Sequence, residues 1–352
     1  MLHGGDTLSY EKYYDGELLD FSSNINPLGV PKGLEEELIK GFKTLTSYPD
    51  IKYRELKTSI KNYLNCDYEN VVVGNGAMEV IDSFIMLSER VITTTPAFAE
   101  YSLRAEVHKK EVVKLEYKDD FSIDIEKLKD TIKERDTLVL GNPNNPTGLR
   151  IPKDTLLEIY KMVVDNNAFL VLDEAFFEFA PKDYDSIELF KENDYKNIGI
   201  IRAATKFFAL PGIRLGYGCT SKELVKDIEF NQMPWSINSL ADIAGQYIFK
   251  NTEYILESSK YINEQREYLL ENLEKYDWIK VYKTHTNYIL IKLNQYDEDY
   301  IFDYFVRKGI VIRKCSSFKV LGKNHIRVAI KDKNSNDKLL RVFDEFEKEE
   351  IK

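Results

Sequence analysis

Short apolar runs alternate with amphipathic stretches from residue 71 onward, and this alternation restricts the possible folds more than any other feature of the sequence. Apolar runs that are buried on both faces and separated by helices are typical of a largely parallel sheet covered by helices. The sequence therefore predicts an α/β fold with a mostly parallel central sheet. The strands are expected at residues 71–73, 90–94, 111–115, 137–140, 169–172, 198–201 and 213–217.

The pattern changes near residue 240. A long polar helical stretch is followed by expected strands at 288–293 and 325–330. At about 150 residues per domain, a chain of 352 residues suggests two domains. We therefore expect a large α/β domain at 46–245 and a smaller C-terminal α+β domain at 246–352. The N-terminal segment, 1–45, should pack with the small domain, because the first clear sheet strand begins only near residue 71.

The charge balance bears on the class of partner. The chain has 49 lysines and arginines against 59 acidic residues, a net charge of −10, which argues against nucleic acid or an anionic membrane as the main partner. No apolar run approaches the ~20 residues that a membrane span needs. The start of the chain shows no basic region followed by an apolar stretch. A cytoplasmic protein is expected, in which a few placed arginines meet any anionic ligand.

Cysteine and histidine are too scattered for a metal site or a disulfide framework. The three cysteines form no CxxC pair, and the four histidines form no HxxxH or HExxH pair. Zinc sites and disulfide-stabilised folds depend on such spacings. We therefore expect no metal and three reduced thiols, at Cys66, Cys219 and Cys315.

Two glycine-rich turns follow expected strands. Residues 71–79, VVVGNGAME, combine a strand, a turn and a helix start, where free backbone N–H groups and the helix dipole suit a phosphate. This motif lacks the third glycine of a dinucleotide fingerprint and the GK[ST] of a P-loop, so a plain tight turn is the alternative. Residues 141–148, GNPNNPTG, lie at the carboxyl end of a strand, where α/β proteins bind ligands.

Two charged side chains stand out beside these turns. Asp173 ends an apolar strand, and a buried carboxylate there needs a partner such as a cationic ring nitrogen. Lys206 lies among apolar neighbours, eight residues before Arg214. A lysine that is desolvated near other cations has a lowered pKa and can act as an amine nucleophile. Taken alone, a solvated lysine is the alternative.

The ordered set GNGAME, PAF, NPNNPTG, DEAF and TKFFALPGIRLGY resembles the class I/II aminotransferase family of fold-type I pyridoxal-phosphate enzymes. The resemblance covers nearly the whole chain. It implies the fold-type I architecture, a mostly parallel central sheet with a smaller α+β domain, and pyridoxal 5'-phosphate as cofactor. By this resemblance Lys206 would hold the cofactor as a Schiff base and move the Cα proton, and Asp173 would keep the ring nitrogen protonated. Asn145 would donate to the phenolic oxygen, and Phe98 would stack on the ring.

The resemblance also implies how the cofactor phosphate is held. Tyr48 is similar to a tyrosine that relatives supply from the other subunit, which implies a homodimer with shared active sites. Two positions depart from the common pattern, because Phe176 stands where many relatives have tyrosine and Ala203 where they have serine or threonine. The remaining phosphate contacts would come from Gly76, Ala77, Met78, Thr205 and Arg214.

Three segments narrow the branch of the family. Residues 3–5 (HGG), 20–29 and 233–241 resemble the threonine-phosphate decarboxylase branch, an activity of cobalamin biosynthesis. This implies a small phosphorylated amino acid as substrate, O-phospho-L-threonine, decarboxylated to aminopropanol phosphate. The histidinol-phosphate aminotransferase branch stays open, because placement of the substrate carboxylate decides between the two reactions. The expected substrate-binding residues are His3, Gly4, Asn24, Asn145, Arg313 and Arg327.

A regulator that senses pyridoxal phosphate without turnover is the alternative from another class of function. Such proteins carry a fused DNA-binding helix-turn-helix domain. The family motifs begin here within the first thirty residues, and the net charge is −10, so the enzyme is favoured.

Overall fold

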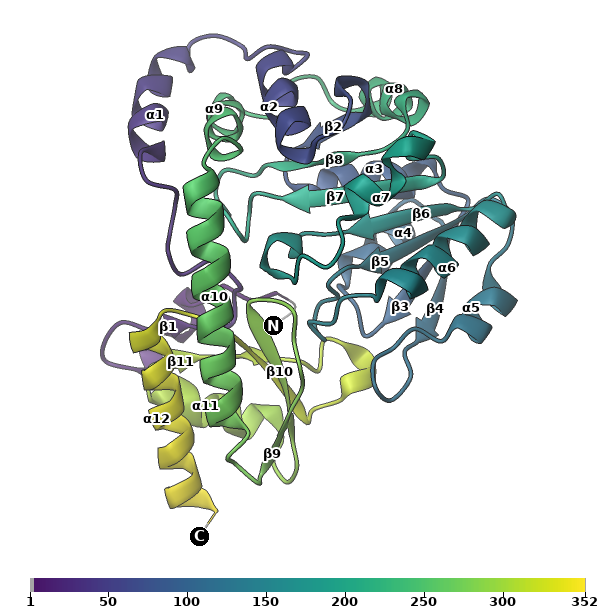
Figure 1. The fold of residues 1–352 in the computed structure, drawn as a ribbon. Helices are drawn as coiled ribbons and strands as arrows, with labels where there is room; N and C mark the ends of the chain where they lie inside the picture. The colour runs from purple at the N-terminus through teal and green to yellow at the C-terminus, as the bar shows by residue number, and fades with distance from the viewer. Residues whose placement is uncertain (1–2, 352) are drawn as a thin grey trace.

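A seven-stranded sheet forms the larger body of the molecule (Figure 1). The structure is a computed structural model that describes residues 3–351. The strand order is β2-β8-β7-β6-β5-β3-β4; neighbours from β4 to β7 pair parallel, whereas β8 runs antiparallel to both β2 and β7. The strands are β2 (Val71–Gly74), β3 (Arg90–Thr95), β4 (Glu111–Glu116), β5 (Asp136–Gly141), β6 (Phe169–Asp173), β7 (Ile198–Ala203) and β8 (Gly216–Cys219).

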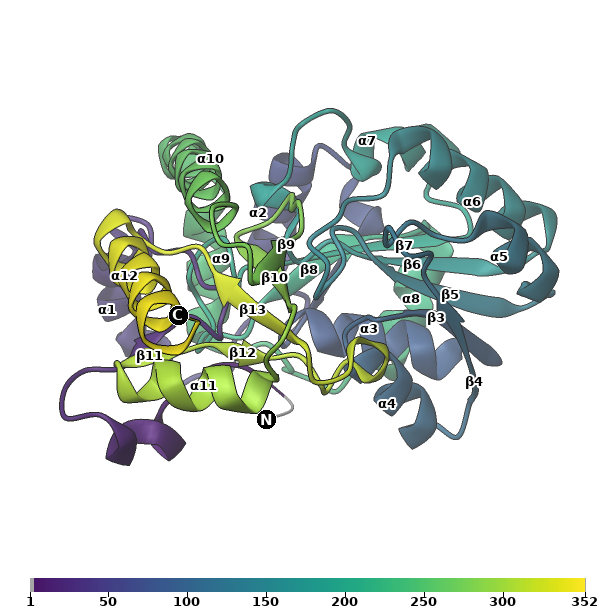
Figure 2. The ribbon, with the colours of Figure 1, turned by 90° about the horizontal axis from the view of Figure 1, so that it is seen from below.

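Helices cover both faces of this sheet, as the alternation of apolar runs predicts (Figure 2). Successive side chains of a strand point to opposite faces, so Val171 packs in one apolar cluster, whereas Leu170 and Leu172 pack in the other. One face carries α3 (Ala77–Leu87), α4 (Glu100–Val107) and α8 (Lys222–Asn231); the other carries α5 (Ile125–Thr131), α6 (Lys153–Asp165) and α7 (Ser186–Phe190). The fold class is therefore confirmed.

The last strand of this sheet differs from its expected position. The sequence predicts a strand at 213–217, but β8 begins only at Gly216. Arg214 adopts a φ of 63°, a left-handed conformation that an extended strand does not accommodate. Residues 213–215 therefore end the loop that follows β7, and this loop carries Lys206.

A smaller antiparallel sheet forms the second body, in the order β12-β13-β10-β9. Helix α10 (Thr252–Leu273) runs from one body to the other (Figure 1). The strands are β9 (Ile279–Val281), β10 (Tyr288–Leu293), β12 (Arg313–Lys314) and β13 (His325–Ala329), and the helices beside them are α11 (Glu298–Arg307) and α12 (Lys333–Glu350).

The N-terminal segment touches both bodies. Strand β1 (Leu19–Asp20) pairs in parallel with β11 (Ile310–Val311) in the smaller body. Farther along, α1 (Leu34–Gly41) packs on α9 (Ser239–Ile248), which lies beside α2 (Arg54–Leu64) in the larger body. The segment at 1–45 thus crosses between the two bodies, and domain boundaries at 45 and 245 stay a prediction. Short 3-10 helices complete the chain at Leu8–Tyr13, Phe42–Thr44, Tyr68–Asn70, Phe177–Phe179, Lys191–Asn193 and Lys319–Leu321.

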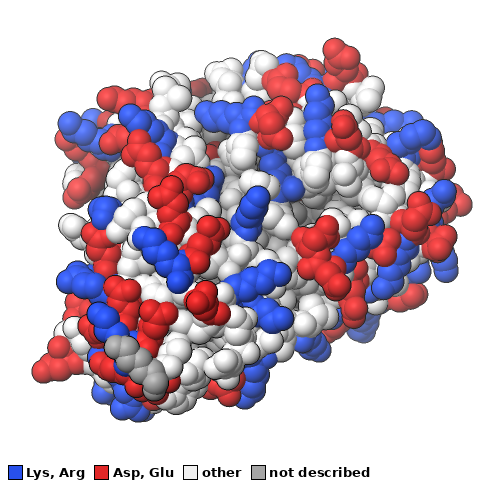
Figure 3. All heavy atoms as spheres, turned by 60° about the horizontal axis from the view of Figure 1, so that its bottom comes forward, with Lys and Arg blue, Asp and Glu red and all other residues white. Residues whose placement is uncertain are grey.

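The surface seen in Figure 3 mixes acidic and basic side chains, with no broad region of one sign. Within residues 3–351, no helix combines the length and the apolar character that crossing a bilayer would need. All three cysteines are free and buried. The same part of the chain contains no group of three or more histidine, cysteine or acidic side chains that could hold a metal ion.

Candidate active site

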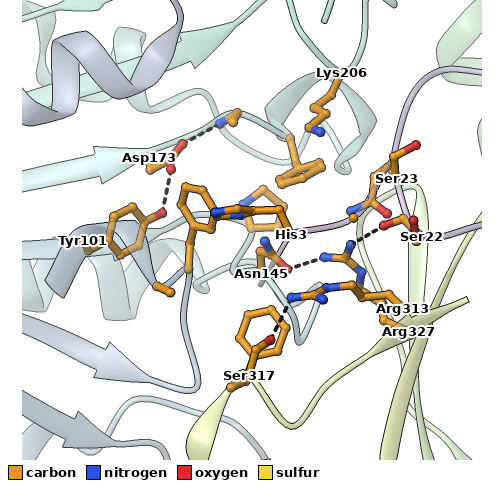
Figure 4. Close-up of a pocket in the computed structure, with 18 residues that line it drawn as sticks. His3, Ser22, Ser23, Tyr101, Asn145, Asp173, Lys206, Arg313, Ser317 and Arg327 are labelled. Carbon is orange, nitrogen blue, oxygen red and sulfur yellow. Dashed lines mark hydrogen bonds between the residues drawn. The ribbon is translucent and has the colours of Figure 1, made fainter. Parts of the chain in front are cut away.

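A cavity of about 210 Å³ lies where the carboxyl ends of β5 and β6 meet the smaller sheet (Figure 4). Parallel strands open a crevice at this edge because the connections on either side diverge to opposite faces. Ten of the sequence-predicted site residues line it together, although they lie far apart in the sequence: His3, Gly4, Asn24, Phe98, Asn145, Asp173, Phe176, Lys206, Arg313 and Arg327.

Asp173 lies at the carboxyl end of β6, on the wall of the cavity, and is 8% exposed. Its Oδ2 accepts a hydrogen bond of 2.6 Å from the hydroxyl of Tyr101, and its Oδ1 accepts one of 3.0 Å from the backbone N–H of Ala175. Burial raises the pKa of this carboxyl, whereas the two hydrogen bonds favour the charged form. A cationic group in the cavity would offset the cost of burying this charge.

Lys206 lies in the loop between β7 and β8, and its amine points into the cavity (Figure 4). Burial, and then the positive charge of Arg327, lower the pKa of this lysine to about 8. About a tenth of such amines are neutral at pH 7, far more than of a lysine in water. The neutral amine is the nucleophilic form, so the site favours the chemistry that the sequence predicts for Lys206.

The glycine-rich turn and Arg214 lie together beside this loop. Gly76 precedes α3 with a φ of 81°, and a Cβ built on it would lie 2.4 Å from Nη2 of Arg214. A side chain at position 76 would therefore displace the guanidinium from the start of α3. The positive charge of Arg214 also contributes to the lowered pKa of Lys206, so the two groups are near each other. A helix N-terminus capped by a guanidinium is suited to a phosphate.

Arg313 and Arg327 are directly opposite each other in the register of β12 and β13. Both are buried, at 2% and 4% exposed. Arg327 donates hydrogen bonds to Oδ1 of Asn145 and to the backbone oxygen of Ser22, the latter over 2.9 Å. The Nε of Arg327 is buried and has no hydrogen-bond partner among the described residues. Burial and the nearby charge of Arg327 lower the pKa of Arg313 to about 10. The pair concentrates positive charge on one wall of the cavity (Figure 4).

Three residues near the start of the described chain line the cavity: His3, Gly4 and Asn24. His3 lies 3.0 Å from a carboxylate oxygen of Glu100, and its ring meets Phe98 edge-on. Gly4 is packed so closely that a Cβ would lie 2.2 Å from the backbone oxygen of Ser22. Asn24 is 3% exposed, and its Oδ1 has no hydrogen-bond partner among the described residues. Asn24 lines the cavity as a residue, whereas this oxygen is buried within the protein.

Six predicted residues do not line the cavity. Tyr48 is 79% exposed and stacks on Trp235, with ring centroids 4.5 Å apart. The other five belong to the expected phosphate site at the start of α3 and in the loop after β7: Gly76, Ala77, Met78, Thr205 and Arg214.

The sequence interpretation missed two supporting contacts. Tyr101, the hydrogen-bond donor to Asp173, follows the stacking candidate Phe98 by three residues, a helical spacing that could have placed both rings on one side. Glu174 is fully buried and forms an ion pair of 3.0 Å with Arg202, whose guanidinium lies 3.4 Å from the ring centre of Phe177. No spacing rule links positions 174 and 202, because neighbouring parallel strands bring them together.

Comparison with known proteins agrees with this geometry. The sequence model of "Aminotransferase class I and II" matches residues 16–343. A protein of Caldanaerobacter subterraneus named "Putative threonine-phosphate decarboxylase" is 38% identical over 347 residues, which are 97% of this chain and 92% of that protein. Threonine-phosphate decarboxylase of Salmonella typhimurium is 31% identical over 332 residues, 93% of this chain and 90% of the relative.

A solved structure points to the same family. The crystal structure of the histidinol-phosphate aminotransferase from Clostridium acetobutylicum superposes with a TM-score of 0.89 at 39% identity and covers 94% of this chain and 99% of that one. The family match extends over most of the chain, and it confirms the enzyme class and the cofactor that the motifs predict. The chain belongs to the class I and II aminotransferase family, whose members are enzymes that use pyridoxal 5'-phosphate.

Proposed function

We propose that this enzyme decarboxylates O-phospho-L-threonine to aminopropanol phosphate, a step of cobalamin biosynthesis. The observation that carries the proposal is the pair of buried guanidiniums of Arg313 and Arg327, held side by side on one wall of the cavity. Their mutual repulsion in a buried site is offset when anionic groups bind beside them. A phosphorylated amino acid carries two such groups, a phosphate and a carboxylate. The names of two relatives at 38% and 31% identity support the same substrate.

The residues present fit the cofactor. Lys206 supplies a partly neutral amine, Asp173 supplies a buried carboxylate suited to a cationic ring nitrogen, and the start of α3 with Arg214 is suited to the phosphate. Phe98 and Phe176 contribute apolar ring faces to the cavity wall. When bound, pyridoxal phosphate supplies an electron-withdrawing ring that weakens the bonds at the substrate Cα.

The side chains of the cavity decide which of those bonds breaks. The bond that stands perpendicular to the cofactor ring is the one weakened, so the enzyme selects the reaction by orienting the substrate. We assign this orientation to Arg327, which Asn145 and the backbone oxygen of Ser22 hold from two sides. Lys206 lies in the same cavity and can take up or return a proton at Cα, because its pKa lies close to neutral pH.

A histidinol-phosphate aminotransferase is the second candidate, and one observation favours it. The solved structure at 39% identity carries that name in its title. Its substrate also has a phosphate, which one guanidinium would bind, but it has no carboxylate at Cα. The second guanidinium would then serve the carboxylates of the amino acceptor, 2-oxoglutarate.

One preparation tests both candidates. The cofactor-loaded enzyme is incubated with O-phospho-L-threonine alone, and with histidinol phosphate plus 2-oxoglutarate. Release of carbon dioxide with formation of aminopropanol phosphate, without a keto acid, is the expected result. Formation of glutamate from the second mixture, with no carbon dioxide from the first, would replace the decarboxylase by the aminotransferase.

We also propose a homodimer with shared active sites. Exposed apolar side chains at 42–48 and 230–235, two segments joined by the stacking of Tyr48 on Trp235, support it, because exposed apolar surface is typical of a protein interface. These exposed side chains include Phe42, which is 59% exposed, and Tyr48, which is 79% exposed, together with Phe230, Met233 and Trp235. Mixing an inactive Lys206→Ala protein with an inactive Tyr48→Ala protein should restore part of the activity if one subunit lends Tyr48 to the other. The cytoplasmic location stays a prediction.

A further inference from the structure

The chain that follows β1 turns around the carboxylate of Asp20. One oxygen of this carboxylate, Oδ1, accepts hydrogen bonds from the backbone N–H and the hydroxyl of Ser22, over 2.8 and 2.6 Å, and from the backbone N–H of Ser23 over 3.2 Å. The other oxygen, Oδ2, accepts a hydrogen bond from the hydroxyl of Ser23. Four donors thus converge on one side chain, in a turn of the kind that aspartate forms with the residues just ahead of it.

The peptide group between Ser22 and Ser23 joins this turn to the catalytic cavity (Figure 4). Its N–H donates to Asp20, and its carbonyl oxygen accepts a hydrogen bond of 2.9 Å from Nη2 of Arg327. The peptide is trans, so its N–H and C=O point in opposite directions. It therefore lies between a carboxylate and a guanidinium, and each end of its dipole meets a group of the opposite charge.

This peptide is buried where it meets the guanidinium. Ser22 is fully buried, and Arg327 is 4% exposed. Hydrogen bonds to charged groups are strong in such surroundings, and a displaced peptide would leave a buried carbonyl or guanidinium unsatisfied. The turn at Asp20 therefore fixes the direction of Nη2 of Arg327, as Asn145 fixes that of Nη1.

The hydroxyl of Ser22 extends the same network to the first described residues. It donates to Asp20 and accepts a hydrogen bond of 2.8 Å from the backbone N–H of Gly5. Gly4 packs against the carbonyl oxygen of Ser22 with no room for a side chain, and His3 beside it lines the cavity. One carboxylate therefore supports two parts of the cavity wall, the buried guanidinium and the N-terminal segment.

The charge of Asp20 also acts on the cations of the site. Burial, and then Arg327, lower the pKa of Lys206; the charge of Asp20 opposes this, whereas Arg214 and Lys331 lower the pKa further. Burial lowers the pKa of Arg327 and of Lys331 as well, and Asp20 opposes the lowering in both. An opposite charge favours the charged form of a group, so Asp20 helps to keep these three cations protonated.

We propose that Asp20 is a positioning residue of this enzyme, which fixes the orientation of Arg327 through the 22–23 peptide and supplies a negative charge near the cations of the cavity. Asp20 itself does not line the cavity, so it acts on a substrate only through the residues that it holds. The proposal rests on the substrate-orienting role of Arg327 proposed above, but not on which of the two candidate substrates is turned over.

Two substitutions separate the shape of this side chain from its charge. Asp20→Asn keeps the length and the Oδ1 acceptor but removes the charge, whereas Asp20→Glu keeps the charge and moves the carboxylate by one methylene group. The assay uses O-phospho-L-threonine or histidinol phosphate, whichever the wild type turns over. We expect kcat/KM to fall about tenfold or more in Asp20→Glu and to stay within about threefold of the wild type in Asp20→Asn. No loss in Asp20→Glu, or an equal loss in both variants, would overturn the positioning role.

A double-mutant cycle tests whether Asp20 acts through Arg327. Losses from two independent sites multiply, whereas losses from two residues of one network do not. Adding Asp20→Glu to Arg327→Ala should therefore lower kcat/KM by no more than about threefold beyond Arg327→Ala alone. A double variant that loses the full product of the two single effects would show an independent structural role and would overturn the proposal.

A pH titration of the absorbance of the cofactor-loaded enzyme tests the charge without turnover. The cofactor would be bonded to the nitrogen of Lys206, and loss of a nearby negative charge disfavours the protonated form of this nitrogen. The midpoint should therefore move to lower pH in Asp20→Asn and stay in place in Asp20→Glu. The matched control Asp15→Asn, which removes a charge from an exposed residue of the same segment, should leave it in place.

An unchanged midpoint in Asp20→Asn would overturn the role of the charge. Because this titration needs no turnover, and because the kinetic assay accepts either substrate, a failure here is distinguishable from a failure of the proposed decarboxylation.

Discussion

Replacing Lys206 by methionine should stabilise the cofactor-free protein at neutral pH, although it abolishes activity. The fold holds this amine in a buried site beside Arg327, which lowers its pKa from 10.5 to about 8. Below pH 8 the folded protein must carry a charged amine in surroundings that disfavour the charge. Methionine has a similar length and no charge, so it removes this cost and retains most of the packing.

The size and the pH range of the effect follow from the two pKa values. The difference between 10.5 and about 8 corresponds to about 3 kcal/mol, at about 1.4 kcal/mol per pKa unit. Between these two pH values the unfolded chain binds more protons than the folded one, so the stability of the wild type rises with pH. The cost is fully present below pH 8 and disappears as the pH rises to 10.5. The stabilisation by Lys206→Met should therefore be about 3 kcal/mol at pH 7 and close to zero near pH 10.5.

Urea unfolding of the two cofactor-free proteins, measured from pH 7 to pH 10.5, gives this difference directly. Other groups that titrate in the same range cancel, because both proteins contain them. Lys260→Met is the matched control, since the Lys260 side chain is 80% exposed on α10; its effect should stay within about 0.5 kcal/mol. A Lys206→Met protein that is no more stable at pH 7, or whose added stability does not change with pH, would refute the reasoning.

Two further substitutions test the catalytic cavity, and a third tests the buried ion pair of Glu174 and Arg202. Arg327→Ala removes a charged hydrogen-bond donor worth about 1.5–3 kcal/mol, so kcat/KM for O-phospho-L-threonine should fall about tenfold to a hundredfold in a carbon dioxide release assay. An unchanged kcat/KM would show that this arginine does not bind the substrate. Tyr101→Phe deletes the 2.6 Å hydrogen bond that favours the charged form of Asp173, so the pKa of Asp173 should rise further. The pH profile of cofactor binding, followed by absorbance, should therefore move to higher pH. An identical profile in the two proteins would contradict this role of Tyr101. Arg202→Met leaves the buried Glu174 without its cation and should lower the free energy of unfolding by about 3–5 kcal/mol in urea, whereas adding Glu174→Gln should recover part of the loss.

Local patterns were enough to predict the large sheet. Six of its strands lie within two residues of their expected positions. A strand buried on both faces must be apolar at nearly every position, which makes the inner strands easy to recognise; the edge strand β4 is only partly buried. The seventh failed at residues 213–215, where two apolar side chains flank Arg214 in a loop. There Arg214 adopts a left-handed backbone, and its guanidinium meets the turn at Gly76, which is far away in the sequence. A local pattern contains no information on such a contact.

The motifs likewise predicted which side chains would gather at the site, since each of them follows a strand of one parallel sheet, and the carboxyl ends of parallel strands share an edge. They did not predict the supports of these side chains. Tyr101 reaches Asp173 across 72 positions, and Asn145 reaches Arg327 across 182. The first contact joins two elements of the larger body, and the second joins the larger body to the smaller one. Periodicity describes the neighbourhood of a residue along the chain. The pKa of Lys206 arises from packing between distant segments, which only the tertiary structure brings together.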